Sequence, residues 1–326
     1  MTHSVDQFLE LRKSLDSAIV GQPHLSERLT IALLADGHIL IEGAPGLAKT
    51  RAVKTLASLI DASFRRIQFT PDLLPSDITG TEIYRPGDAK FEFQQGPLFN
   101  EIILADEINR APAKVQSALL EAMAEQQVSV GSVTYGLPAL FLVIATQNPI
   151  EHEGTYDLPQ AQQDRFLMQV NVDYPTAADE NRILELSRKE TIQSSQTASV
   201  LPGITHEQIF TARQEINSVH VSPAVQEYMV QLIIATRSAA AYNTDFARYL
   251  SSEIEYGASP RATIALDRSA RARAWLYHRD YVTPEDVQSL AHDCLRHRIA
   301  LSLQALTQGR TSDQIIDDLI SLVPVG

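Results

Sequence analysis

This sequence of 326 residues has a single cysteine, no long apolar run and no excess of positive charge. The single cysteine, Cys294, cannot form a disulfide within the chain, and the charged segment Met1–Val20 lacks the apolar block of a signal peptide. The longest apolar run, Ala139–Ala145, is far shorter than the roughly 20 residues of a membrane-spanning helix. With 27 basic against 40 acidic side chains, the net charge of −13 opposes bulk attraction to nucleic acid or to an anionic membrane. We therefore expect a cytoplasmic protein that neither inserts into a membrane nor binds nucleic acid.

The composition is that of an ordinary globular chain, with 44% hydrophobic and 21% charged residues. The length suits two domains of about 150 residues each. Short apolar segments alternate with helical patterns, and we predict strands at His38–Ile41, Ile67–Phe69, Ile102–Ala105, Ala139–Ala145 and Met168–Val172. Val115, Leu119 and Met123 recur at the spacing of one helix face. This alternation predicts a parallel sheet covered by helices on both faces.

Two segments have the pattern of β-hairpins inserted into this alternation. Their paired segments are Glu82–Arg85 with Lys90–Phe93, and Gln127–Val130 with Val133–Tyr135. The polar segment Thr191–Gly203 is predicted to be a linker. Beyond it, the clearest local signals in the sequence are those of helix N-termini. Capping residues stand at Thr205, Ser222, Ser259 and Thr283, the last three each followed by proline. We therefore predict that the C-terminal third is helical.

The most informative octet follows the strand predicted at His38–Ile41 and precedes the helical stretch Arg51–Leu59. It consists of Gly43, Ala44, Pro45, Gly46, Leu47, Ala48, Lys49 and Thr50. Strand, glycine-containing loop and helix in this order form a phosphate-binding loop, whose backbone N–H groups surround anionic phosphates. Lys49 would reach the β- and γ-phosphates, and the Thr50 hydroxyl would bind Mg²⁺. Ala48 departs from the general pattern, because a glycine usually precedes this lysine.

Two adjacent carboxylates, Asp106 and Glu107, end the strand predicted at Ile102–Ala105. An isolated pair of acidic residues usually lies on the surface without a functional role. Here the parallel strands bring the pair to the same sheet edge as the phosphate loop. Asp106 would then hold Mg²⁺ through water, and Glu107 would orient and polarise the attacking water. The two elements together indicate hydrolysis of a nucleoside triphosphate. We expect ATP rather than GTP, because no guanine-selecting Asn-Lys-x-Asp element is present.

At this point the chain resembles the MoxR-type AAA+ ATPases over nearly its whole length. The most specific stretches are Phe69–Tyr84, Gly96–Met123 and Thr146–Phe166. Ala48 is typical of that family. Asp157, Gln160 and Gln163 stand where the family usually has proline, glutamate and leucine, which puts fine contacts near a subunit interface in doubt.

The resemblance implies further site residues. Asn148 would be the sensor-1 residue that contacts the γ-phosphate or the lytic water; the alternative is a turn asparagine. Arg165 would be the arginine finger that reaches a neighbouring subunit's site; the alternative is a salt bridge with Asp164. Arg110 is a weaker candidate for a second contact between subunits. Val20, Gly21 and Gln22, together with Ile19, resemble the segment that encloses adenine.

Arg261 also has a physical argument of its own. It lies in the first turn of a predicted helix, where a cation opposes the helix dipole at a cost of a few tenths of a kcal/mol. An anion opposite it would remove that cost, and the resemblance implies one, since Arg261 would be the sensor-2 residue that touches the γ-phosphate. The alternative is a solvated arginine.

The resemblance implies a P-loop αβα core at residues 1–200 with two hairpin insertions, followed by an all-α lid at residues 201–326. It implies ATP and Mg²⁺ as ligands and a homo-oligomeric, hexameric ring in which Arg165 serves a neighbour. Turnover would change the angle between core and lid through Arg261. The role implied is chaperone-like maturation of another protein, often with insertion of a metal cofactor, together with a von Willebrand factor A domain partner. The hairpins would engage that partner on the axial surface of the ring.

Two rival functions stay open, a nucleic-acid-dependent motor and a nucleotide-gated scaffold without turnover. The acidic balance opposes the first, and Asp106, Glu107 and Asn148 oppose the second.

Two further patterns in the sequence do not predict a binding site. His292 and His297 are spaced so that they would not share one helix face, which opposes a metal site with Cys294. A group of four arginines is interpreted as a solvated or interfacial helix face: Arg268, Arg271, Arg273 and Arg279.

Overall fold

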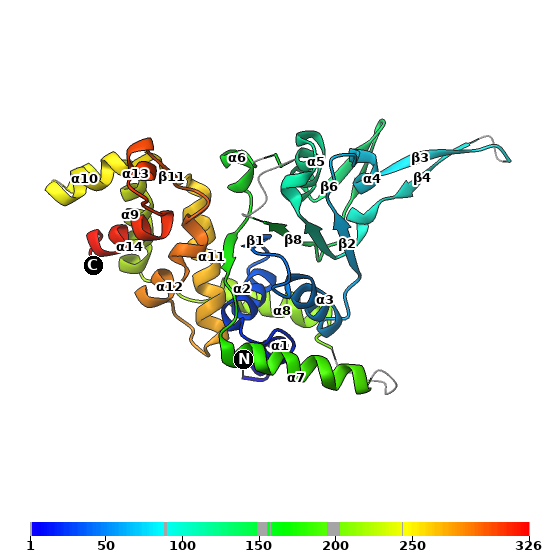
Figure 1. Ribbon diagram of the computed structural model, residues 1–326, viewed down its shortest axis with the longest axis horizontal. Coiled ribbons are helices and arrows are strands. Elements are labelled where there is room, and N and C mark those ends of the chain that lie inside the picture. The colour runs from blue at the N-terminus through cyan, green and yellow to red at the C-terminus, as the bar shows by residue number, and fades with distance from the viewer. Residues whose placement is uncertain are drawn as a thin grey trace.

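The computed structural model describes residues 2–87, 90–148, 155–156, 158–193, 203–242 and 244–325. Its centre is a five-stranded parallel sheet in the order β2-β5-β8-β1-β9 (Figure 1). The strands are β1 (Ile39–Gly43), β2 (Phe64–Gln68), β5 (Ile102–Asp106), β8 (Leu142–Gln147) and β9 (Met168–Val172). The predicted α/β class and parallel sheet are confirmed.

Side chains of the central strands alternate between two buried clusters, because successive residues of a strand point to opposite faces. Ile39 and Ile41 pack in one cluster with the helices of the N-terminal and C-terminal regions, whereas Leu40 packs in the other with α5. The core helices are α1 (Thr2–Ala18), α2 (Pro23–Leu34), α3 (Lys49–Leu59), α4 (Pro75–Thr79), α5 (Ala113–Glu125), α6 (Gln160–Gln163) and α7 (Ala177–Gln193). The short 3-10 turns are η1 (Pro97–Phe99), η2 (Ile108–Arg110) and η3 (Ala239–Tyr242). Helices on both faces make the predicted three-layer sandwich.

The strand order brings chemically important loops to one sheet edge. β8 lies between β1 and β5 and is parallel to both. The loop after β1, the acidic end of β5 and the residue after β8 therefore meet at the carboxyl edge of the sheet, where open α/β sheets bind their ligands.

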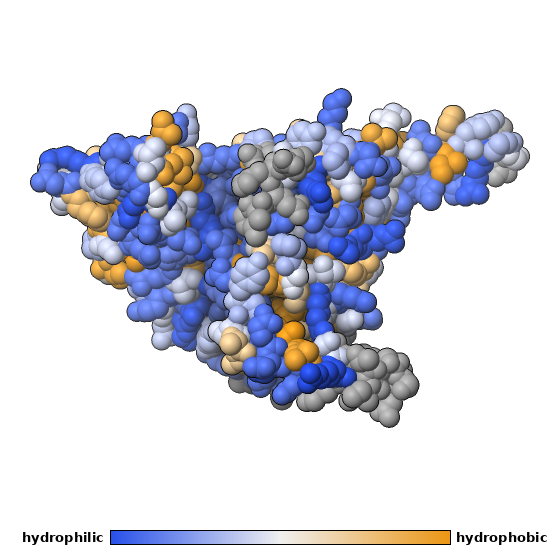
Figure 2. All heavy atoms as spheres, in the orientation of Figure 1, coloured by the Kyte–Doolittle hydropathy of each residue, from blue (hydrophilic) through white to orange (hydrophobic). Residues whose placement is uncertain are grey.

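Both predicted hairpins are present. They are β3 (Gly80–Arg85) with β4 (Lys90–Gln95), and β6 (Gln127–Val130) with β7 (Val133–Gly136). The first projects far from the sheet, and its side chains Ile83, Tyr84 and Phe91 are exposed (Figures 1 and 2). The rings of Phe93 and Tyr135 stack with centroids 4.0 Å apart, so the two hairpins contact each other near their bases.

The C-terminal region is helical, as predicted, apart from one short pair of strands. It comprises α8 (His206–Asn217), α9 (Pro223–Ser238), α10 (Asp245–Glu253), β10 (Ile254–Tyr256), α11 (Pro260–Leu276), α12 (Pro284–Leu295), β11 (Ala300–Leu301), α13 (Leu303–Thr307) and α14 (Ser312–Leu322). The predicted caps at Thr205, Ser222, Ser259 and Thr283 all precede helices. These helices pack against α1 and α2, and the buried ion pair of Arg28 with Asp293 joins α2 to α12 at 2.6 Å.

Several predicted boundaries shift. β2 begins at Phe64, earlier than predicted, because it is an edge strand whose exposed Arg65 and Arg66 hide its apolar pattern. β8 begins at Leu142 rather than at residue 139. The helix α7 runs to Gln193, into the predicted linker, and residues 194–202 of that linker lie outside the described residues. No helix in the described ranges combines the length and the apolar character needed to cross a bilayer.

Candidate functional site

The predicted phosphate loop connects β1 to α3, and its backbone has two left-handed positions. Gly46 has φ of +85° and Ala48 has φ of +56° with ψ of +15°. Only glycine adopts this region without strain, so the backbone explains why glycine usually stands at the Ala48 position. The structure therefore retains the turn at the expense of some strain in an L-residue.

Replacing Ala48 with glycine is expected to stabilise the protein by about 0.5–1 kcal/mol. Relief of the left-handed conformation, worth about 1–2 kcal/mol, outweighs the entropy that glycine adds to the unfolded chain. The matched control is Ala52→Gly, which places the same change inside α3 and should destabilise by about 1 kcal/mol or more. Free energies of unfolding from denaturant titration measure both, and a destabilised Ala48→Gly protein would contradict the explanation.

Lys49 begins α3 and is buried, and its Nζ donates to the carbonyl oxygen of Gly43 at 2.6 Å. Burial lowers its pKa, and the carboxylates of Asp106 and Glu107 oppose that shift. The ammonium group is thus directed at the loop backbone, close to the two acids. Thr50 is the next residue of the same helix, half-buried in its first turn.

Asp106 is the last residue of β5 and is buried. One carboxylate oxygen, Oδ1, accepts a hydrogen bond of 2.6 Å from Thr146 Oγ1 on β8. The other, Oδ2, accepts from the guanidinium of Arg66 on β2, with Nε at 2.9 Å. A metal ion bound to Asp106 would share this carboxylate with Arg66 or displace the arginine.

Glu107 also has a left-handed backbone, with φ of +55°. Its N–H donates to Thr146 Oγ1 at 2.9 Å, which fixes the backbone against β8. Its Oε2 accepts from Gln68 Nε2 and from Arg110 NH1, both at 2.8 Å. Strained non-glycine residues concentrate at functional sites, where the surrounding structure holds them. Arg110, a candidate for contact between subunits, here binds a carboxylate of its own chain.

Three residues that the sequence pattern did not single out contact the two acids: Arg66, Gln68 and Thr146. Their position on the strands that neighbour β5 could have identified them, since Gln68 is in register with Asp106. Identifying them in this way requires the order of the strands in the sheet, which the sequence pattern did not provide. Asn148, which was predicted, follows β8 directly and is buried. Its neighbours at residues 149–154 and Asp157 lie outside the described residues.

These groups fit Mg²⁺ bound with a nucleotide. In the described part of the chain, no three His, Cys, Asp or Glu side chains form a ligand set of their own. Mg²⁺ in nucleotide sites uses one or two protein oxygens together with phosphates and water, so a complete set of protein ligands is not required. The Thr50 hydroxyl and the Asp106 carboxylate are oxygen donors of that kind, next to a loop suited to phosphate.

A cavity of 420 Å³ joins the phosphate loop to the segment predicted to enclose adenine. Val20 and Gln22 line it together with Gly46 and Ala48, and helix α7 closes another side. Gly21 has φ of +83°, and Gln22 Nε2 donates to the carbonyl oxygen of Asp173 at 2.8 Å. The structure thus brings these two distant parts of the sequence together.

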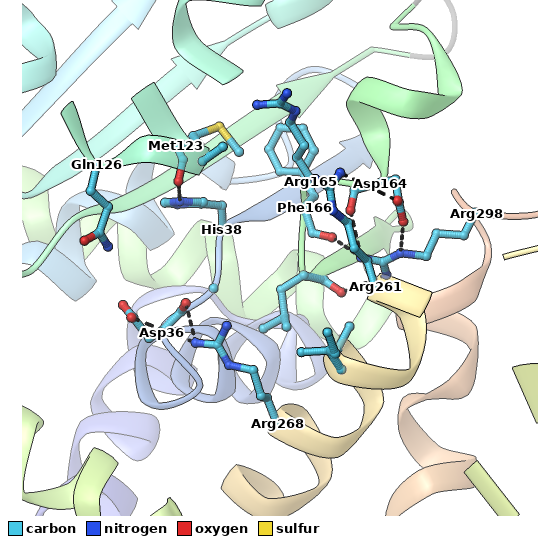
Figure 3. Close-up of a pocket in the computed structure, with 15 residues that line it drawn as sticks. Asp36, His38, Met123, Gln126, Asp164, Arg165, Phe166, Arg261, Arg268 and Arg298 are labelled. Atoms are coloured by element: carbon cyan, nitrogen blue, oxygen red, sulfur yellow. Dashed lines mark hydrogen bonds and ion pairs between the residues drawn. The ribbon is translucent and has the colours of Figure 1, made fainter. Parts of the chain in front are cut away.

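Arg165 and Arg261 line a different cavity, of 360 Å³ (Figure 3). Arg165 is exposed, and its NH1 donates to the carbonyl oxygen of Leu120 at 2.7 Å. The carboxylate of Asp164 instead pairs with Arg298 at 2.8 Å and with Arg261 at 3.8 Å. These contacts do not include the salt bridge between Asp164 and Arg165 that was the alternative for Arg165.

The two cavities lie at opposite ends of β1. Gly37 and His38, just before the strand, line the cavity of Arg165, whereas the phosphate loop follows the strand's last residue. Five residues that rise about 3.3 Å each separate the ends by roughly 15 Å. Arg165 and Arg261 are thus not placed to reach the phosphate loop of their own chain.

The features set aside in the sequence have structural roles. Cys294 is buried, and burial raises the pKa of its thiol to about 11. α12 ends at Leu295, so His297 is not on the helix that carries His292. All four arginines are ion-paired within the chain: Arg268 with Asp36, Arg271 with Asp267, and both Arg273 and Arg279 with Asp286.

Comparison with known proteins agrees with this fold. The sequence profile described as "ATPase family associated with various cellular activities (AAA)" matches residues 38–168, and the "AAA lid domain" profile matches residues 247–319. Chaperone MoxR1 of Mycobacterium tuberculosis is 45% identical over 94% of this chain and 78% of its own length. The uncharacterised protein YeaC of Bacillus subtilis is 42% identical over 95% and 92%. The crystal structure of a predicted ATPase from Cytophaga hutchinsonii superposes with a TM-score of 0.90 at 44% identity, covering 100% of this chain and 96% of that one. The chain belongs to the MoxR family of AAA ATPases.

Proposed function

We propose that this protein hydrolyses ATP at the carboxyl edge of its sheet, between the phosphate loop and the end of β5. The loop backbone from Gly43 to Ala48 would surround the phosphates, and Lys49 would contact the β- and γ-phosphates. Thr50 and Asp106 would hold Mg²⁺, which when bound neutralises phosphate charge. The cavity beside Val20, Gly21 and Gln22 has room for the adenine.

Glu107 is the proposed group that orients and polarises the attacking water. Gln68 and Arg110 bind one of its oxygens and Thr146 binds its backbone, so the carboxylate is held in one place before the reaction begins. Such preorganisation lowers the reorganisation needed in the transition state. Asn148 follows the neighbouring strand β8 and is proposed to contact the γ-phosphate or the water.

The site is proposed to be completed by a second copy of the chain. The observation that carries this proposal is the position of Arg165 and Arg261 at the opposite end of β1 from their own phosphate loop. Arg261 has 55% of its side chain exposed and opposes the dipole of α11, an arrangement that an incoming anion would stabilise. A neighbour's γ-phosphate is that anion in our proposal, and a closed hexameric ring would give every subunit one such neighbour.

The biological role follows from the family by analogy. We propose chaperone-like remodelling of a partner protein in the cytoplasm, with maturation of a metal cofactor and a von Willebrand factor A domain partner as the specific form. The projecting hairpin, with Tyr84 and Phe91 exposed, is the proposed contact surface for that partner. The core is proposed to span residues 1–200 and the lid residues 201–326.

Steady-state ATPase assays over a range of protein concentrations test the proposal. The rate per subunit should rise with concentration as assemblies form, in parallel with their mass by light scattering, because a lone subunit lacks its neighbour's arginines. A rate per subunit independent of assembly would contradict a shared site. Clear stimulation by single-stranded DNA would favour a nucleic-acid motor, and absence of phosphate release from assembled protein would favour a scaffold.

A further inference from the structure

The carboxylate of Asp164 joins the two elements that carry the exposed arginines. Asp164 is the residue after α6 and directly precedes Arg165, and only 13% of its side chain is exposed. Its Oδ2 accepts a hydrogen bond of 2.7 Å from Ser259 Oγ, and Arg261 NH1 lies 3.8 Å from the same oxygen. Its Oδ1 accepts from Arg298 Nε at 2.8 Å (Figure 3). One buried side chain thus contacts both the start of α11 and the turn after α12.

Arg298 fixes the backbone on both sides of Arg165. Its side chain is 2% exposed, and its guanidinium donates to the carbonyl oxygens of Asp164 at 3.2 Å and Leu167 at 3.1 Å, and also to that of Phe166. A buried cation needs a carboxylate and further acceptors to offset its desolvation. Asp164 supplies that carboxylate. The peptide that carries Arg165 is therefore bound to the lid through Arg298.

Ser259 fixes the start of α11 in a similar way. Its Oγ caps the helix by accepting from the N–H of Arg261 at 3.1 Å, and it donates its own proton to Asp164. The helix turn that carries Arg261 is thereby bound to the residue that precedes Arg165. The relative position of the two arginines therefore depends on Asp164, which is also ion-paired with Arg261.

We propose that Asp164 is a positioning residue that holds Arg165 and Arg261 as one unit facing the neighbouring copy. This inference rests on the proposed function, in which both arginines act on the neighbour's nucleotide. A displacement of about 1 Å between groups that act together costs as much as about 100-fold in rate. The effect of Asp164 should therefore appear in the neighbour's turnover and not in nucleotide binding by its own subunit.

The test is complementation in mixed assemblies of full-length protein. Asp164→Asn keeps the size of the side chain and removes its charge, and we expect kcat of the assembled variant to fall about 100-fold with ATP affinity unchanged. Mixing it with Lys49→Ala subunits, which keep their arginines but lose nucleotide, should restore up to about a quarter of wild-type turnover, the share of correctly ordered interfaces in a random mixture. Mixing it with Arg165→Ala subunits should restore nothing, because both variants fail to serve a neighbour. Asp267→Asn, which removes a carboxylate paired with Arg271 elsewhere on α11, is the matched control and should keep wild-type turnover.

The results of these mixing experiments distinguish failure of the inference from failure of the proposed function. Wild-type turnover in assembled Asp164→Asn, or recovery with Arg165→Ala but not with Lys49→Ala, would overturn the inference. Failure of Arg165→Ala to recover with Lys49→Ala would instead refute the proposed function, so the two failures are distinguishable. If Asp164→Asn does not fold, Ser259→Ala removes the hydrogen bond between α11 and Asp164 together with the cap of α11, and leaves the pair of Asp164 with Arg298. That variant should lose about tenfold in kcat with the same complementation pattern, and unchanged kcat would refute the inference.

Discussion

Replacing Glu107 with glutamine is expected to lower the rate of ATP hydrolysis by about 10²–10⁴-fold while ATP affinity stays close to wild type. Glutamine keeps the shape of the side chain and can accept from Gln68 or Arg110, but it cannot take a proton from water. The phosphate loop, Lys49 and Asp106 are unchanged, so the nucleotide should still bind. Phosphate release under saturating ATP and binding of a fluorescent ATP analogue measure the two effects separately.

The control for this variant is Glu121→Gln on the exposed face of α5, which makes the same chemical change away from the site. It should leave both turnover and affinity unchanged. Wild-type turnover in Glu107→Gln would show that another group activates the water. Loss of ATP binding would show that Glu107 serves the architecture of the site instead.

Replacing Arg165 with alanine is expected to lower turnover by about 10³–10⁵-fold, the range that arginine fingers supply in related P-loop enzymes. The variant should still bind ATP, because Arg165 lies at the opposite end of β1 from its own phosphate loop. The side chain of Arg165 is exposed and donates to the carbonyl oxygen of Leu120, so its loss should change stability little. Turnover of assembled variant protein and thermal unfolding measure these effects.

Complementation gives this prediction its sharpest form. Arg165→Ala subunits bind ATP but lend no arginine, whereas Lys49→Ala subunits lend an arginine but bind no ATP. A mixture of the two inactive proteins should regain activity. Arg182→Ala on the exposed face of α7 is the control and should behave as wild type. No recovery in assemblies proved to be mixed by tag pull-down would contradict a site built across subunits.

The sequence was most informative where the chemistry is local along the chain. The loop before Lys49, the pair Asp106 and Glu107, and the helix caps each depend on residues within a few positions of one another. The structure has the loop between β1 and α3, the two acids at the end of β5, and the caps before helices. Both hairpins were predicted from alternating residues around a turn, for the same reason. Local backbone preference and side-chain chemistry are sufficient at such places.

Contacts between sheet neighbours were not predictable in the same way. Arg66 and Gln68 reach the two acids only because β2 pairs with β5, and a charged edge strand gave a weak pattern. The place of Arg261 also depended on how α11 packs on the core, which its own sequence does not encode locally. The sequence indicated an anion opposite Arg261. In the structure the Asp164 carboxylate of the same chain lies 3.8 Å from its NH1, whereas the phosphate loop of that chain lies at the other end of β1.

The most direct measurement is a structure of assembled Glu107→Gln protein with ATP and Mg²⁺. We expect the triphosphate at the loop before α3, Mg²⁺ beside Thr50 and Asp106, and Arg165 and Arg261 of a second copy at the γ-phosphate. Nucleotide bound elsewhere, or assemblies in which no neighbour's arginine approaches the phosphates, would contradict a nucleotide site shared between two copies of the chain.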